Sequence, residues 1–102
     1  EAIQAYKSAV KINPTDAESL SSLGRLYTRR GESLDVASVL CEQSVRLFPN
    51  NASFRHHLGR TYLNQGKLDQ ALAEFELALA LGHDSQPQIA ETQTRLMAAK
   101  AS

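Results

Sequence analysis

Two short segments carry the side chains best suited to bind an anion. Arg25 and Arg29 lie four residues apart, and the second segment contains His56, His57 and Arg60. A guanidinium donates two parallel hydrogen bonds to a carboxylate or a phosphate, and an imidazole gains positive charge below its ordinary pKa of about 6.5. These residue types therefore favour an acidic segment, a C-terminal carboxylate or a phosphorylated peptide as the ligand.

The other reactive side chains lack the partners that catalysis or metal binding needs. Cys41 is the single cysteine and is expected to pack as a small buried residue. His56 and His57 are adjacent, so on a helix they diverge by about 100° and do not form the i, i+4 pair of a metal site. The sequence has neither a nucleophile-elbow serine nor a phosphate-binding glycine loop. It predicts no enzyme, no metal site and no cofactor.

The composition is typical of a folded protein, and the balanced charges produce no overall electrostatic field. Hydrophobic residues make up 42% and charged residues 22%, which excludes disorder as the default. Basic and acidic residues both number 11, so net charge does not attract the chain to nucleic acid or to an anionic membrane. No apolar run approaches the ~20 residues that span a bilayer. The lone thiol favours a reducing compartment such as the cytoplasm, and Glu1 in place of methionine indicates a piece of a longer protein.

A repeated pattern must position the candidate side chains. Leu23-Gly24-x-x-Tyr27-x-x-x-Gly31 returns about 35 residues later as Leu58-Gly59-x-x-Tyr62-x-x-x-Gly66. A second pattern, Ala-x-x-x-aromatic-x-x-Ala followed by proline, has one full copy and two altered ones: Ala2, Tyr6, Ala9 and Pro14; Ala37, Cys41, Ser44 and Pro49; Ala71, Phe75, Ala78 and His83. The two patterns alternate along the chain.

Apolar residues at helical spacing predict six helices, at roughly residues 1–12, 16–30, 34–47, 52–65, 68–81 and 86–100. Prolines and glycines mark the boundaries, and Thr15-x-x-Glu18 and Ser85-x-x-Gln88 fit the capping-box pattern. The short connections require neighbouring helices to run antiparallel.

This alternation resembles the tetratricopeptide repeat, a helical hairpin of ~34 residues. The resemblance implies an all-α, right-handed solenoid that acts as a non-enzymatic adaptor or scaffold for another protein. Residues 1–14 would be the second helix of a partial repeat, 15–49 a full repeat with one extra residue at Ser33, 50–83 a second full repeat, and 84–102 a C-terminal capping helix.

In such solenoids the first helix of each hairpin lines the concave surface, so its outer face is the candidate ligand surface. The helical register places seven residues there: Ser21, Arg25, Arg29, His56, His57, Arg60 and Asn64. Some members of the family hold terminal carboxylates with a lysine and asparagine clamp that is not matched here. The resemblance therefore favours a peptide class other than the chaperone tails those clamps bind.

Two other functions remain open. Ala2, Tyr6 and Ala9 form an apolar stripe whose hairpin partner would lie upstream, so the chain could self-associate or extend a longer solenoid through it. Related ~35-residue helical repeats read single-stranded RNA, although the neutral net charge argues against that use.

Three residues depart from the repeat pattern. Arg55 occupies a bulky apolar position and is expected to extend past Phe54 to solvent. Cys41 and Ser44 replace larger or more apolar residues and are expected to loosen their hairpin.

Overall fold

The computed structural model describes residues 2–101 and consists of six α-helices in a row. They are α1 (Ala2–Ile12), α2 (Ala17–Arg30), α3 (Leu34–Leu47), α4 (Ala52–Asn64), α5 (Leu68–Ala80) and α6 (Gln86–Ala101). The predicted all-α solenoid is confirmed, and the helix boundaries agree to within about one residue. The predicted start of the first helix at Glu1 and the predicted end of the domain at Ser102 lie outside the described residues. No helix within residues 2–101 is long and apolar enough to cross a membrane.

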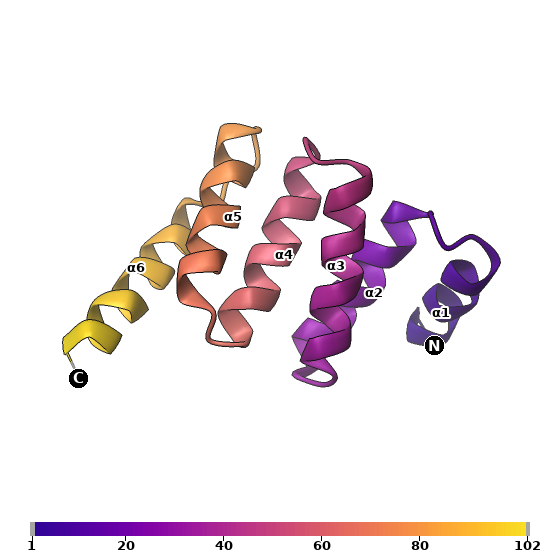
Figure 1. Cartoon of the computed structure of the whole chain (residues 1–102), viewed down its shortest axis with the longest axis horizontal. Coiled ribbons are helices and arrows are strands. Elements are labelled where there is room, and N and C mark those ends of the chain that lie inside the picture. The colour runs from indigo at the N-terminus through magenta and orange to yellow at the C-terminus, as the bar shows by residue number, and fades with distance from the viewer. Residues whose placement is uncertain (1, 102) are drawn as a thin grey trace.

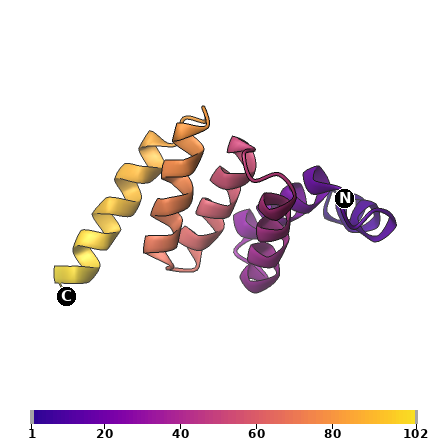
Figure 2. The same cartoon turned by 45° about the horizontal axis from the view of Figure 1, so that its top comes forward.

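Neighbouring helices run antiparallel, and the row bends between α1 at one end and α6 at the other (Figures 1 and 2). The longest dimension of the molecule is 46 Å. Contacts are most extensive within the hairpins α2–α3 and α4–α5. The core between these hairpins is built largely from α3, α4 and α5, and its largest buried side chains include Phe54, Leu58, Tyr62 and Phe75.

Two glycines allow the helices of each hairpin to approach closely. A Cβ atom added at Gly24 would lie 2.5 Å from the Cys41 Sγ atom, and one added at Gly59 would lie 2.8 Å from the Phe75 ring. Both distances are too short for real contacts, so only glycine fits. The repeated Leu-Gly pattern therefore marks the closest approach of α2 to α3 and of α4 to α5.

Cys41 and Ser44 are fully buried in α3 rather than lying beside an open gap. The Sγ atom of Cys41 fills the space opposite Gly24, and the Ser44 hydroxyl donates to the Cys41 carbonyl at 2.7 Å. Burial raises the pKa of the Cys41 thiol to about 11, so it stays protonated at neutral pH. The thiol packs as a small apolar group, as predicted, and the stability of this hairpin relative to its neighbours remains a prediction.

Both predicted capping boxes are wrong. Helix α2 is capped by Asp16, whose side chain accepts from the Ser19 amide, and the Thr15 hydroxyl donates instead to Asn13 at 2.9 Å. The Ser85-x-x-Gln88 box does not form, because the Gln88 Oε1 atom has no hydrogen-bond partner and the Ser85 hydroxyl is hydrogen-bonded to His56. Asn51 caps α4 in the same way as Asp16 caps α2. The capping residue therefore stands two positions after the proline in both repeats.

The turn between α2 and α3 contains two residues in the left-handed region, Gly31 at φ 67° and Ser33 at φ 50°. Ser33 is the position at which the sequence places the extra residue. Among residues 2–101 it alone has positive φ without being glycine, so the longer turn is accommodated by backbone strain at one serine.

Arg55 does not simply extend into solvent. Its Nε atom donates to the Pro49 carbonyl at 2.9 Å, and its Nη1 atom pairs with Glu74 at 3.1 Å. Phe54 beside it is buried in the core. Arg55 therefore links the start of α4 to α5, an interaction worth up to about 1 kcal/mol at this partial exposure.

Candidate functional site

Side-chain hydrogen bonds hold α2 against α4 beneath the candidate ligand surface. The Ser21 hydroxyl lies 3.0 Å from His57 Nδ1, and the Thr28 and Thr61 hydroxyls lie 2.7 Å apart. Farther along, the Asn64 amide donates to the Thr28 carbonyl at 3.1 Å. These three contacts are spread along both helices, so they fix the angle at which the first helices of the two hairpins cross.

Replacing Thr61 by valine is expected to lower the free energy of unfolding by about 1 kcal/mol, because a buried hydroxyl–hydroxyl contact is lost. Thr61 is fully buried. Each hydroxyl has a single hydrogen, so one threonine donates across to the other helix while the other donates to its own helix carbonyl. Denaturant unfolding measures the effect. The double variant with Thr28→Val should cost less than the sum of the single changes, and strict additivity would contradict this pairing.

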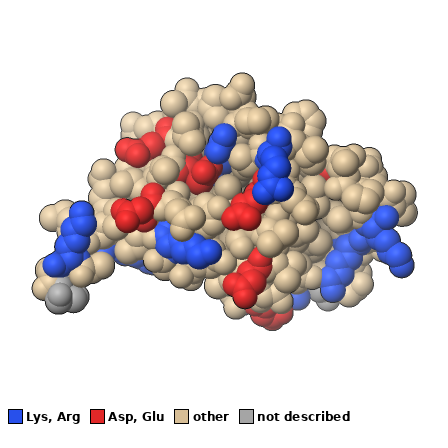
Figure 3. Space-filling model, in the orientation of Figure 1, with Lys and Arg blue, Asp and Glu red and all other residues tan. Residues whose placement is uncertain are grey.

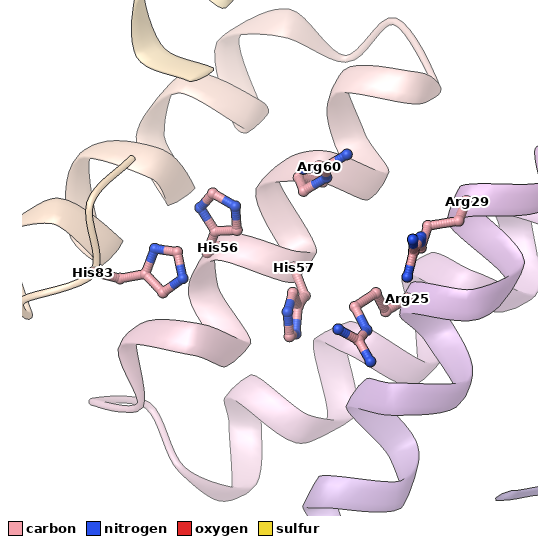
Figure 4. Close-up of a pocket in the computed structure, with 6 residues that line it drawn as sticks. All are labelled: Arg25, Arg29, His56, His57, Arg60 and His83. Atoms are coloured by element: carbon pink, nitrogen blue, oxygen red, sulfur yellow. The ribbon is translucent and has the colours of Figure 1, made fainter. Parts of the chain in front are cut away.

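A pocket of about 270 Å³ opens above this network. Figure 4 shows that α2 supplies two arginines on one side, α4 supplies two histidines and an arginine, and the α5–α6 loop supplies a third histidine. The lining residues are Arg25, Arg29, His56, His57, Arg60 and His83. None of them is acidic. On the face shown in Figure 3, by contrast, acidic side chains lie among basic ones over α3, α4 and α5.

Five of the seven residues predicted from the sequence line the pocket, and the other two do not. The five are Arg25, Arg29, His56, His57 and Arg60. Ser21 is only 2% exposed and lies beneath the pocket, where its hydroxyl meets His57. Asn64 is exposed, but its amide is already donated to the Thr28 carbonyl. Both residues position α2 and α4 rather than line the pocket.

Sequence reasoning missed His83. The repeat pattern indicates only that it replaces the proline that ends the earlier repeats. Its ring stacks on that of His56, with centroids 4.1 Å apart and planes 26° apart. Its position in the sequence could have indicated this contact. A residue that directly follows a hairpin lies next to the start of the first helix of that hairpin, because the two helices run antiparallel.

Two of the histidines are neutral at physiological pH. Burial, followed by nearby His83, lowers the pKa of His56 to about 4, and burial, followed by nearby Arg25, lowers the pKa of His57 to about 4. The expectation that these imidazoles become charged just below pH 6.5 is therefore wrong. Helical register identified their direction but not how deeply the neighbouring helices bury them.

The positive charge of the pocket comes from its three arginines. Within residues 2–101, Arg25, Arg29 and Arg60 form no ion pair with an acidic side chain. In addition, Arg25 Nε and His83 Nδ1 are shielded from solvent and have no hydrogen-bond partner. Residues 2–101 contain no group of three or more His, Cys, Asp and Glu side chains arranged to hold a metal ion. The arrangement is therefore suited to bind an anion.

Comparison with known proteins identifies similar sequences and structures. A family profile described as tetratricopeptide repeat matches residues 32–96, and a second, described as TPR repeat, matches residues 1–31. The NMR structure of the first TPR domain of the human RPAP3 protein is similar with a TM-score of 0.89 at 18% identity, covering 98% of this chain and 80% of that one. A search of curated proteins finds no match.

Two further solved structures are similar. The first TPR of Spaghetti (RPAP3), bound to the HSP90 peptide SRMEEVD, has a TM-score of 0.85 at 18% identity over 93% of this chain and 77% of that one. MamA MSR-1 C2 has a TM-score of 0.74 at 22% identity over 97% of this chain and 58% of that one. At these identities the likeness concerns the fold.

Proposed function

The chain belongs to the tetratricopeptide repeat family, and from this premise we propose that it is a non-enzymatic module that binds an acidic partner peptide. The peptide would place a side-chain or C-terminal carboxylate in the pocket between α2 and α4. Arg25, Arg29 and Arg60 would hold the carboxylate, and Ser21 and Asn64 would keep the two helices in place.

The observation that carries this proposal is the unbalanced charge of the pocket. Its three guanidiniums have no acidic partner within the described residues, although acidic side chains are plentiful on the face formed by α3 to α5. Each guanidinium offers a fork of donors that fits a carboxylate. A partner that supplies carboxylates would remove the mutual repulsion of the arginines and gain charge-assisted hydrogen bonds.

A similar fold supports the class of ligand without fixing its identity. The first TPR of Spaghetti (RPAP3) is described as bound to the HSP90 peptide SRMEEVD, which is acidic at its C-terminal end. The lysine and asparagine clamp is not matched in this chain, and the equivalent surface carries arginines and histidines. We therefore expect an acidic peptide of another sequence to bind more tightly than SRMEEVD.

Replacing Arg25 and Arg60 together by alanine is expected to weaken acidic-peptide binding by more than about tenfold, since each charge-assisted contact contributes roughly 1 to 3 kcal/mol. The probe is a fluorescein-labelled heptaglutamate with a free C-terminus, compared with an amidated heptaglutamine, and the readout is fluorescence anisotropy. Circular dichroism should show unchanged helicity and melting, because neither guanidinium has an acidic partner to lose.

The matched control is Arg46→Ala, which removes an exposed arginine of α3 that does not line this pocket. It should leave peptide affinity unchanged. Equal affinity in all three proteins would move recognition to another surface. Unfolding of the double variant would show that these arginines serve the fold instead.

The two rival functions predict different outcomes. Self-association would use the α1 stripe, where Ala2 is exposed and Tyr6 and Ala9 are half-buried; it would appear as a concentration-dependent mass that Tyr6→Glu abolishes. RNA binding would appear as an affinity for a single-stranded oligonucleotide that falls steeply with salt. Either result, together with indifference to heptaglutamate, would replace the peptide proposal.

A further inference from the structure

We propose that the group seated in the pocket is a phosphate monoester on a serine or threonine of the partner peptide. The inference rests on the proposed function and specifies its ligand chemistry. In this inference a single anionic group binds residues of both α2 and α4. That distinguishes the pocket from a surface that binds acidic peptides in general.

The number of arginines points to a dianion. One carboxylate carries one negative charge and presents two oxygens, whereas a phosphate monoester carries close to two negative charges at pH 7 and presents three strong acceptor oxygens. Arg25 and Arg29 approach from α2, and Arg60 approaches from α4 (Figure 4). Three guanidiniums around one cavity match three oxygens better than two, and leave less uncompensated charge.

The cavity also provides neutral donors. His56 Nδ1 lies 2.7 Å from the Ser85 hydroxyl, and His57 Nδ1 lies 3.0 Å from the Ser21 hydroxyl. When each Nδ1 accepts the serine hydrogen, the other ring nitrogen carries the proton and can donate to an oxyanion. Because both serines are buried, they hold the imidazoles in fixed orientations at the floor of the pocket.

Two buried atoms of the pocket lack a hydrogen-bond partner. Arg25 Nε, which can only donate, and His83 Nδ1 are both buried without a hydrogen bond. Unpaired buried groups of this kind cost free energy. A phosphate drawing the Arg25 guanidinium toward the cavity would give its Nε hydrogen an acceptor.

The test compares three pentapeptides that differ only at the central residue, which is phosphoserine, glutamate or serine between pairs of glycines. Acetylated and amidated ends leave the central side chain as the single source of charge. Titration is followed by the NMR shifts of the His56, His57 and His83 ring protons. We expect the phosphoserine peptide to bind at least about tenfold more tightly than the glutamate peptide, and the serine peptide to cause no shift.

Variants link the binding to the arginines. Arg25→Lys keeps the charge but loses the planar fork, so it should weaken binding of the phosphoserine peptide by about tenfold. Arg46→Ala should change neither. Inorganic phosphate is titrated as well, and it should bind more weakly than the phosphoserine peptide, because it lacks the peptide backbone contacts.

The outcomes separate the two proposals. Glutamate binding as tightly as phosphoserine, with both lost in the Arg25/Arg60 double alanine variant, would overturn the phosphate inference and leave the acidic-peptide function standing. If inorganic phosphate binds as tightly as the phosphopeptide, the inference that the phosphate belongs to a peptide is overturned. Failure of both charged peptides and of heptaglutamate to bind would overturn both proposals.

Discussion

Leucine in place of Gly59 is expected to lower the free energy of unfolding by roughly 3 kcal/mol, the range of severe overpacking. The Cβ atom alone would lie 2.8 Å from two carbons of the Phe75 ring and 3.1 Å from a third. Phe75, on α5, is fully buried in the core, where close packing resists movement of its ring. The helices must therefore separate. Urea unfolding monitored by circular dichroism measures the loss.

A matched control and a rescue make this prediction specific. Gly66→Ala meets nothing within 4 Å and is strained only by its φ of 78°, so it should cost about 1 kcal/mol. Gly59→Ala combined with Phe75→Leu should cost less than the sum of the two single changes, because the smaller side chain leaves room for the new methyl group. Stability unaltered by Gly59→Leu would contradict the packing of α4 on α5.

The helices could be predicted closely because their determinants are local. Leu-Gly at positions 23 and 24 returns at 58 and 59, and in both copies the glycine faces a small or aromatic residue of the next helix. The caps were harder to predict. Thr15 and Asp16 are both good capping residues and differ by one position, so sequence alone does not decide which side chain turns toward the helix end.

The site was only partly predictable, because helical register gives the direction of a side chain but not what covers it. The register predicts Ser21 on the concave side, yet Ser21 is buried and its hydroxyl meets His57 of the adjacent α4. His83 lies in a loop, where periodicity gives no direction at all. Its contact with His56 arises from the way the α5–α6 loop returns to α4, which depends on the packing of α4 and α5.

Lowering the pH from 7 to 5 is expected to destabilise the protein by up to about 2 kcal/mol for each of His56 and His57. Their pKa values are about 4 in the folded protein and about 6.5 when unfolded. The unfolded chain therefore binds more protons between these values. The stability that these two neutral imidazoles contribute is fully present above pH 6.5 and is lost as the pH falls toward 4. Thermal melting across pH 7 to 5 measures this, above the range in which most carboxylates titrate.

Variants of these imidazoles and of the groups that face them can separate destabilisation by histidine protonation from general effects of acid. The cationic side chains of Arg25 and Arg60 and the nearby ring of His83 oppose protonation, and the neutral hydroxyls of Ser85 and Ser21 meet the Nδ1 atoms. His56→Gln combined with His57→Gln should flatten the melting profile between pH 7 and 5.

His83→Gln should reduce the slope of melting temperature against pH only in part, because it removes a neighbour that opposes protonation but not the burial that is the larger cause. A melting temperature constant between pH 7 and 5 in the unmodified chain would show that these imidazoles reach water. The pocket would then gain charge on acidification, and its anion affinity would rise as the pH falls without any loss of stability.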